Sequence, residues 1–270
     1  MKDSKAHLFR PRKQLGQHFL VDKNIIEKIL THCQLKKDES VLEIGPGLGA
    51  ITGEIAGRVH HVFAVEKDKR FCDELSRRFK YLKNITLIHG DFLKMDFSSL
   101  PGELKVIGNL PYYISSAIIA KALENRKQVE SLFITVQWEF GKRLAAKINS
   151  KDYSALSVFV QYYMQPKMLF KIKHTAFRPT PKVDSCFVHL ALKKTLEPAA
   201  SDESLLWEIV HKAFQQRRKQ IINSLGATIG KEEIKNILKR LGLNAELRAE
   251  NLTPQDFVNL ANCLGAQNSV

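Results

Sequence analysis

Four consecutive residues, Asn109-Leu-Pro-Tyr112, combine hydrogen-bond acceptors with an aromatic ring. A proline disfavours helical backbone at the residue before it, so we expect Leu110 to be extended, with its carbonyl pointing outward beside the side-chain oxygen of Asn109. Two such acceptors can take both N–H bonds of an exocyclic amino group while Tyr112 stacks on the base. Acceptors that localise the nitrogen lone pair and aim it at a sulfonium methyl favour methyl transfer by positioning and electrostatics. The alternative is a proline turn with a packed tyrosine.

A glycine-rich turn predicts where a nucleoside would lie. In Val41-Leu-Glu-Ile-Gly-Pro-Gly-Leu-Gly49, a short apolar strand breaks into three glycines, and residues 50–56 read as the start of a helix. Glycine allows a sharp turn and lets a ligand lie directly on the backbone. Glu66 ends the next apolar run, where its carboxylate could accept both ribose hydroxyls. The alternative is a tight turn with a solvated acid.

Four apolar runs each carry or end in a polar residue. Ligands bind beyond the carboxyl ends of parallel strands, so these side chains are expected to converge along one edge of a sheet. They are Glu43, Glu66, Asp91 and Asn109.

Strand and helix patterns alternate along most of the chain, which predicts an α/β fold. Two late strands, 168–172 and 186–192, are joined by a short link and can pair antiparallel at the edge of a parallel sheet. We expect earlier strands at 41–44, 62–65, 86–89, 104–107 and 132–136, helices at 67–80, 115–125 and 139–148, and a further apolar run at 156–164.

The chain ends in a wholly helical pattern. Residues 194–204 read as a linker, and Thr253 is expected to cap the last helix. Near the other end, Asp22 is expected to cap a helix that begins after it. The composition therefore predicts two domains, 1–196 and 197–270.

The overall charge indicates a partner rich in phosphate. The 270 residues include 42 Lys and Arg against 28 Asp and Glu, a net charge of +14, and residues 1–13 read as a basic arm. No apolar stretch is long enough to span a bilayer, and the N-terminus lacks the apolar core of a signal peptide. The four cysteines form no Cys-x-x-Cys pair, and the histidines show no metal-ligand spacing. We expect reduced thiols, no metal and a cytoplasmic location.

Four ordered motifs resemble one known family. The sequence between Leu8 and Ala261 is similar to the S-adenosylmethionine-dependent ribosomal RNA adenine dimethyltransferases, specifically the small-subunit (kasugamycin-sensitivity) enzymes. The resemblance implies a Rossmann-like class I methyltransferase with a mostly parallel seven-stranded sheet and a small all-helical C-terminal domain. The motifs are Gln17-His-Phe-Leu20, Glu43-Ile-Gly-Pro-Gly-Leu-Gly49, Asn109-Leu-Pro-Tyr112 and Phe177-x-Pro-x-Pro-x-Val-x-Ser185.

The same resemblance implies site residues and a substrate. Tyr112 and Phe177 would stack on the target base, and the family dimethylates two adjacent adenosines in a hairpin near the 3′ end of small-subunit rRNA, in an immature subunit. A monomer is expected. The implied catalytic residues are Asn109, Leu110, Pro111 and Tyr112, and the implied S-adenosyl-L-methionine contacts are Gln17, His18, Leu20, Glu43, Gly45, Gly47, Glu66, Lys67, Asp91, Phe92 and Asn109.

Other readings remain open at this point. The large-subunit erythromycin-resistance enzymes share much of the pattern, although Pro46, Leu48 and His18 favour the small-subunit branch. Tyr113 and Trp138 depart from the family pattern beside the catalytic loop and on an expected RNA-facing helix, as does Ser116. A non-catalytic RNA-binding factor and a nicotinamide-dependent oxidoreductase are the alternative classes; the oxidoreductase rests only on the glycine turn and the following acid.

Overall fold

The structure, a computed structural model, describes residues 16–267, so the predicted basic arm lies outside the described residues. The chain forms two compact units. One comprises the chain up to Gly141 together with Lys167–Leu192, and the other comprises Lys142–Pro166 together with the chain from Lys193 onward. The predicted boundary at residue 196 differs from this division, because 142–166 pack with the C-terminal helices.

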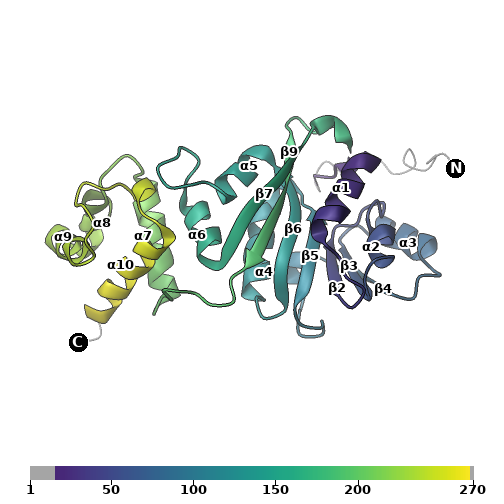
Figure 1. The fold of residues 1–270 in the computed structure, drawn as a ribbon, viewed down its shortest axis with the longest axis horizontal. Helices are drawn as coiled ribbons and strands as arrows, with labels where there is room; N and C mark the ends of the chain where they lie inside the picture. The colour runs from purple at the N-terminus through teal and green to yellow at the C-terminus, as the bar shows by residue number, and fades with distance from the viewer. Residues whose placement is uncertain (1–15, 268–270) are drawn as a thin grey trace. The chain divides into compact units, whose positions relative to one another are not determined.

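A seven-stranded sheet forms the first unit, as Figure 1 shows. Its order is β4-β3-β2-β5-β6-β9-β7, with parallel pairs from β4 to β6 and an antiparallel pair between β6 and β9. The predicted mostly parallel, seven-stranded sheet is therefore confirmed. Its strands are β2 (Ser40–Ile44), β3 (His61–Glu66), β4 (Ile85–His89), β5 (Leu104–Asn109), β6 (Val129–Gln137), β7 (Met164–Ile172) and β9 (Ser185–Leu192).

The register brings the carboxyl ends of the central strands level. Ile44, the last residue of β2, is paired with Val65 of β3 and with Gly108 of β5. The glycine turn after β2, Glu66 at the end of β3 and Asn109 at the end of β5 therefore lie at one edge, as the strand-end argument predicts.

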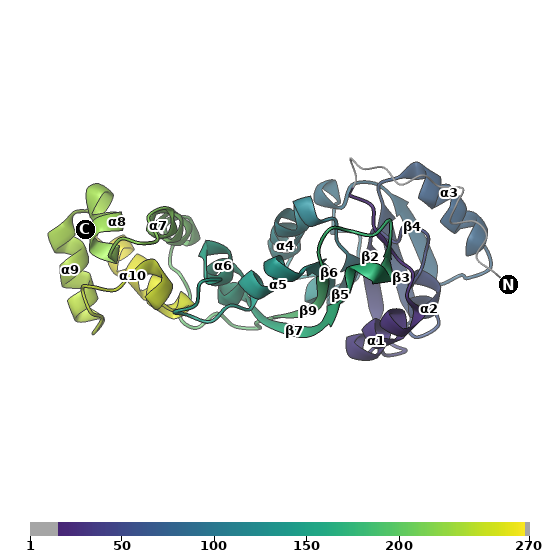
Figure 2. The same cartoon turned by 90° about the horizontal axis from the view of Figure 1, so that it is seen from above.

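Helices cover both faces of this sheet, which explains why its central strands are apolar runs without alternation. Figure 2 shows α1 and α4 on opposite sides of it. The buried side chains of α1 include Ile29 and Leu30, which join Val41, Val62 and Ile107 in one core. The helices of this unit are α1 (Lys23–Cys33), α2 (Thr52–Ala56), α3 (Lys69–Arg78), α4 (Ser115–Glu124) and α5 (Trp138–Leu144), of which α5 runs on into the second unit.

Helix α1 begins where the sequence predicts. The Asp22 carboxylate accepts hydrogen bonds from the backbone amides of Asn24 (2.9 Å) and Ile25 (3.2 Å). These two amides have no carbonyl partner inside the helix, so the side chain replaces one.

A small second sheet has no counterpart in the prediction. Strands β1 (Phe19–Leu20) and β8 (Phe177–Arg178) pair antiparallel, with Leu20 opposite Phe177. Two-residue strands have no periodicity to detect, so only the fold reveals them. Their pairing fixes the segment that precedes α1 to the link between β7 and β9.

The two late strands lie next to each other at one end of the sheet, as predicted. Strand β9 pairs antiparallel with β6, and β7, which contains Pro166 as edge strands can, is the edge strand. The apolar run 156–164 forms helix α6 (Ala155–Tyr163). This helix belongs to the second unit, where the buried Tyr153 hydroxyl just before it donates to the Leu252 carbonyl at 2.9 Å.

The second unit is helical, as predicted for the C-terminal part. The Thr253 hydroxyl accepts the backbone N–H of Asp256 at 3.1 Å, which confirms the predicted cap of the last helix. Helix α8 was not predicted. Among the described residues, no helix has the length and apolar content needed to cross a membrane. Besides α6, the helices of this unit are α7 (Glu203–Gln215), α8 (Ile221–Ile229), α9 (Lys231–Arg240) and α10 (Pro254–Gln267).

Candidate active site

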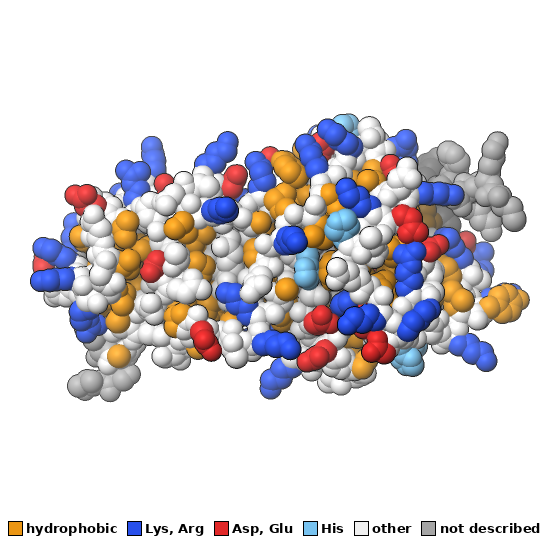
Figure 3. All heavy atoms as spheres, in the orientation of Figure 1, with side chains coloured by type: hydrophobic (Ala, Val, Ile, Leu, Met, Phe, Trp, Pro, Cys, Tyr) orange, Lys and Arg blue, Asp and Glu red, His pale blue; other side chains and the backbone are white. Residues whose placement is uncertain are grey.

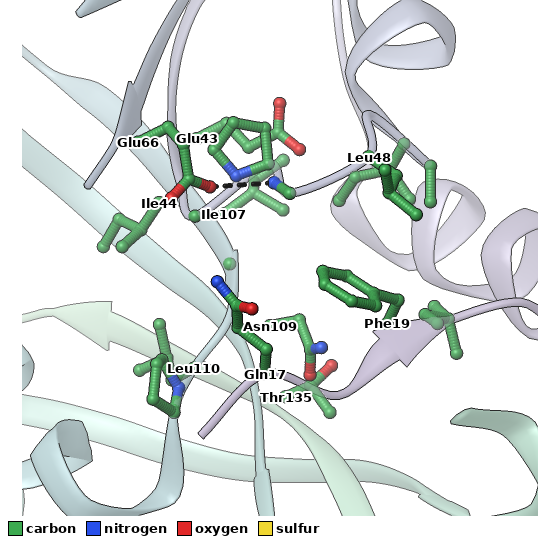
Figure 4. Close-up of a pocket in the computed structure, with 18 of the residues that line it drawn as sticks. Gln17, Phe19, Glu43, Ile44, Leu48, Glu66, Ile107, Asn109, Leu110 and Thr135 are labelled. Carbon is green, nitrogen blue, oxygen red and sulfur yellow. Dashed lines mark hydrogen bonds between the residues drawn. The ribbon is translucent and has the colours of Figure 1, made fainter. Parts of the chain in front are cut away.

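A cavity of about 1070 Å³ opens at the carboxyl edge of β2, β3, β4 and β5. Sequence motifs far apart in the chain meet here, including the segment before α1, which folds over the glycine turn. Figure 4 shows this lining, with Phe19 and Gln17 opposite Glu66. Of the sequence-predicted site residues, those that line the cavity are Gln17, His18, Leu20, Glu43, Gly45, Gly47, Glu66, Lys67, Asp91, Phe92, Asn109, Leu110, Pro111 and Tyr112.

The glycine turn needs glycine for two separate reasons. Gly45 has a φ of +64°, and a Cβ added there would meet no atom within 4 Å, so its open side faces space that a ligand can fill. Gly49 has a φ of +73°, and an added Cβ would lie 2.7 Å from Leu75 Cδ2. The first glycine therefore leaves room for a ligand, and the second lets α3 pack against the turn.

Glu66 is held rigidly at the end of β3. Its Oε2 accepts the Gly47 N–H at 3.0 Å and its Oε1 accepts the Asp68 N–H at 2.8 Å, and Figure 4 draws the first of these bonds. Burial raises the pKa of this carboxyl, and the two amides oppose the rise. A carboxylate has about four acceptor positions, so the side chain can still accept two hydroxyls. This geometry fits the predicted contact with a ribose.

Glu43 is the least solvated acid of the site. It is 1% exposed, and its Oε2 has no hydrogen-bond partner among the described residues. Burial raises the pKa of its carboxyl to about 8, with a smaller contribution from the neighbouring Glu66. An unpartnered carboxyl oxygen beside a cavity favours a ligand that brings hydrogen-bond donors or positive charge.

Lys67 and Asp91 form an ion pair at the β4 side of the cavity. The ammonium lies 2.8 Å from Asp91 Oδ2, and the other carboxylate oxygen accepts the backbone N–H of Leu93 at 3.1 Å. The hydrogen bond from Lys67 lowers the pKa of Asp91. Asp91 thus caps a short 3-10 helix, Phe92–Lys94, and presents a charged carboxylate to the cavity, where the resemblance implies a cofactor contact.

The Asn109 amide is oriented by the segment that covers it. Its Nδ2 donates to the backbone carbonyl of His18 at 2.7 Å. Because the amide nitrogen is committed there, its Oδ1 is the acceptor that this side chain can offer to a target amine. The backbone N–H of the next residue, Leu110, donates to Thr135 of β6 at 3.1 Å, which fixes the loop to the sheet.

Tyr112 is held on two sides. Its hydroxyl hydrogen-bonds the Ser185 hydroxyl at 2.8 Å, and its ring stacks against His18, with 6.0 Å between centroids and 22° between planes. The His18 ring is itself fixed by a 2.7 Å contact between Nδ1 and the Pro179 carbonyl. A tyrosine restrained in this way can present its ring to a base without a large loss of side-chain entropy.

Phe177 does not lie where the stacking role requires. Its side chain is 1% exposed, it is absent from the cavity lining, and it packs in the core with Leu20 and Ala176. Pairing of β8 with β1 directs this side chain inward. Stacking of Phe177 on a base is thus a contact that this conformation cannot make.

Sequence reasoning missed Asp68, which ties the covering segment to β3. This aspartate is 2% exposed and accepts hydrogen bonds from Gln17 Nε2 (3.3 Å) and Arg70 Nη2 (2.6 Å). The contact with Arg70 lowers its pKa to about 2. Its position two residues after Glu66, before a helical pattern, is the N-cap signal that could have identified it.

The arrangement suits positioning chemistry. It offers acceptors for an amine at Asn109, a tyrosine for a base and a carboxylate for a ribose, all facing one cavity. Within residues 16–267, no group of three or more His, Cys, Asp or Glu side chains could hold a metal ion.

Curated relatives are similar to this chain along most of its length. A ribosomal RNA small subunit methyltransferase A of Pelotomaculum thermopropionicum is 38% identical over 95% of this chain and 92% of its own length. The protein of the same name from Moorella thermoacetica is 39% identical over 94% of this chain and 92% of its own length.

Solved structures confirm the predicted methyltransferase fold. A dimethyladenosine transferase from Plasmodium falciparum superposes with a TM-score of 0.84 at 24% identity, covering 93% of this chain and 98% of that one. The 23S rRNA methyltransferase ErmE superposes with a TM-score of 0.74 at 26% identity, covering 92% and 99%. The sequence also matches the ribosomal RNA adenine dimethylase family from residue 8 to residue 265. With that match over nearly its whole length, the chain belongs to the ribosomal RNA adenine dimethylase family, enzymes that methylate adenine in ribosomal RNA.

Proposed function

We propose that this enzyme uses S-adenosyl-L-methionine to convert two adjacent adenosines, in a hairpin near the 3′ end of small-subunit rRNA, to N6,N6-dimethyladenosine. The observation that carries the proposal is the Asn109 amide, whose nitrogen is committed to the His18 carbonyl so that its oxygen is left to accept from an amine. Neither RNA binding alone nor hydride transfer needs that acceptor next to a nucleoside site.

The cavity fits the cofactor by size and by polarity. Its volume of about 1070 Å³ lies at the upper end of typical ligand pockets, enough for a cofactor together with a flipped base. Glu66 is placed for the ribose, Gly45 leaves open space beneath a ligand, and Glu43 offers an unpartnered oxygen to a cationic one. When bound, S-adenosyl-L-methionine supplies an electrophilic methyl on a positively charged sulfur.

The protein's own contribution to the reaction is to hold the amine. The Asn109 side-chain oxygen and the Leu110 carbonyl accept its two N–H bonds, which localises the nitrogen lone pair, and Tyr112 stacks on the ring. With the amine held between Asn109 and the Leu110 carbonyl, the bound cofactor would supply the methyl group that is transferred to this nitrogen, and the nitrogen would release a proton to solvent. Placement of charge and geometry supplies the rate enhancement.

The choice of the small subunit rests on the relatives. Proteins named ribosomal RNA small subunit methyltransferase A match at 38% and 39% identity, whereas ErmE, a 23S rRNA enzyme, matches at 26%. The immature subunit as substrate, the monomeric state and the cytoplasmic location remain predictions from the sequence.

Methyl transfer from labelled cofactor to unmodified small ribosomal subunits tests the proposal. Large subunits, naked rRNA and DNA serve as parallel substrates, and the modified nucleoside is identified by mass. We expect dimethyladenosine on small subunits alone. Label on large-subunit RNA would assign the protein to the 23S branch. Absence of label on every substrate, with calorimetric cofactor binding that is lost in Glu66→Ala, would leave the non-catalytic binding factor as the function.

A further inference from the structure

A basic segment lies beside the target side of the cavity. Residues Lys171–Asp184, which we name the basic loop, run from the end of β7 to the start of β9 and contain four Lys and Arg side chains against one acid. Figure 3 shows Lys and Arg side chains gathered with a histidine over this turn. None of the roles assigned to the cavity uses these cations.

One carboxylate organises the cations of the basic loop. Asp184 accepts hydrogen bonds from the backbone N–H of His174 at 3.0 Å and lies 2.8 Å from its Nδ1. The Lys171 ammonium is 3.0 Å from Asp184, and that of Lys173 is 3.7 Å away. The lysine side chains are 41% and 72% exposed, whereas that of Asp184 is only 17% exposed. The cluster therefore presents cations to solvent and keeps its counter-ion inside.

Trp138 holds the loop against the sheet. Its backbone N–H donates to the Asp184 carbonyl at 3.0 Å, and the Lys171 ammonium lies 4.9 Å from its ring centroid. Trp138 follows β6 directly, so the carboxyl end of a central strand fixes the position of the cations. At this position, which departs from the family pattern, Trp138 offers an aromatic face that the neighbouring Lys171 covers.

The basic loop is attached to the residues that surround the target base. Ser185, the residue after Asp184, hydrogen-bonds the Tyr112 hydroxyl at 2.8 Å. Within the loop, the Pro179 carbonyl contacts the His18 ring at 2.7 Å. The loop is therefore fixed to the Tyr112 side of the cavity at two points, one of them at its end.

Strand order places the loop opposite the nucleoside contacts. The glycine turn, Glu66 and Asp91 lie at the carboxyl ends of β2, β3 and β4, on one side of β5 in the sheet. The basic loop joins β7 and β9, on the other side of β5. A substrate strand whose base reaches Asn109 at the end of β5 has the cofactor contacts on one side and these cations on the other.

We propose that the basic loop binds phosphates of the RNA strand that flank the target adenosine, chiefly through its exposed lysines Lys173 and Lys182, with Lys171 held in place by Asp184. The inference rests on the proposed function, because it takes the cavity to receive a base from RNA. Extruding a base requires the backbone on both sides of it to be held, and lysines bind phosphates as point charges without reading sequence.

A pair of charge-removing substitutions tests the loop. In Lys173→Gln/Lys182→Gln, the plot of log affinity for unmodified small ribosomal subunits against log salt concentration should become less steep by about 1.4 to 1.8, since each lost phosphate contact contributes about 0.7 to 0.9. We expect the KM for these subunits to rise while kcat at saturation and calorimetric cofactor affinity stay at the wild-type values. Lys173→Arg/Lys182→Arg should restore the slope.

Lys83→Gln/Lys127→Gln is the matched control. Both are exposed lysines that precede β4 and β6, at the sheet edge opposite the cavity. The control therefore removes as many positive charges as the loop variant does, but away from the cavity. A loop variant with the wild-type slope, or one that changes no more than this control, would overturn the loop proposal while wild-type methylation continues. Failure of the wild-type protein to methylate any RNA would instead refute the proposed function, whatever the slopes show.

Discussion

Replacing Glu43 by glutamine should change how the stability of this protein depends on pH. The wild-type carboxyl is buried and has an oxygen without a hydrogen-bond partner, and burial raises its pKa from the usual 4.5 to about 8. The folded protein therefore keeps a proton that the unfolded chain releases. The stability that this group contributes is fully present below about pH 4.5. It is lost as the pH rises through the pKa of Glu43 in the folded protein, about 8.

The size of the effect follows from that difference. One pKa unit corresponds to about 1.4 kcal/mol, so raising the pH from 5 to 8 should lower the wild-type free energy of unfolding by about 3 kcal/mol through this group alone. Glutamine has nearly the same shape and does not titrate. In Glu43→Gln we expect that part of the pH dependence to be absent. The free energy of unfolding of the variant should therefore increase relative to that of the wild type as the pH rises.

Urea denaturation of both proteins at pH 5, 6, 7 and 8 measures this directly. Glu124→Gln, on an exposed position at the end of α4, is the control for loss of an acid and should leave the pH dependence unchanged. Parallel stability curves for wild type and Glu43→Gln would refute the reasoning, because they would mean that Glu43 is ionised in the folded protein.

The same titration should couple to cofactor binding. S-adenosyl-L-methionine brings positive charge into the cavity that Glu43 lines, which lowers the pKa of a neighbouring carboxyl and releases its proton. Calorimetry at pH 7 in buffers of different ionisation enthalpy should detect proton release by the wild type and less of it by Glu43→Gln. Equal proton release by the two would place the linkage elsewhere.

Three further substitutions separate the parts of the site. Asn109→Ala should lower the single-turnover rate by about 10²- to 10³-fold, as for loss of one preorganised polar contact, and a rate within threefold of wild type would contradict its role. Tyr112→Phe removes only the hydrogen bond to Ser185 and should retain most activity, whereas Tyr112→Ala should raise the activation free energy of methyl transfer by about 1–3 kcal/mol. Equal rates for the two variants would argue against stacking. Gly49→Ala should destabilise the fold by about 1–3 kcal/mol in urea denaturation, because its Cβ would lie 2.7 Å from Leu75; an unchanged midpoint would contradict this.

Local signals in the sequence determined the core of this site. The apolar runs that form β2, β3 and β5 are short and continuous because both faces of a parallel sheet are covered. Each ends at a residue that must lie on the same edge, so Glu66 and Asn109 could be placed together without a structure. Their chemistry also follows from residue type, since it depends on a glycine turn, an acid and an amide at fixed distances from strand ends.

Tertiary structure alone decided what covers and braces that edge. The contact between His18 and Pro179 joins residues 161 apart in the chain, and that between Gln17 and Asp68 joins residues 51 apart. Two-residue strands such as β1 and β8 carry no period, so nothing local predicts that they pair or that Phe177 turns into the core. Likewise, an apolar helix such as α6 does not specify which element it packs against, because the hydrophobic effect depends on the apolar area that is buried and not on the partner. Only the tertiary structure shows that 142–166 pack with the C-terminal helices.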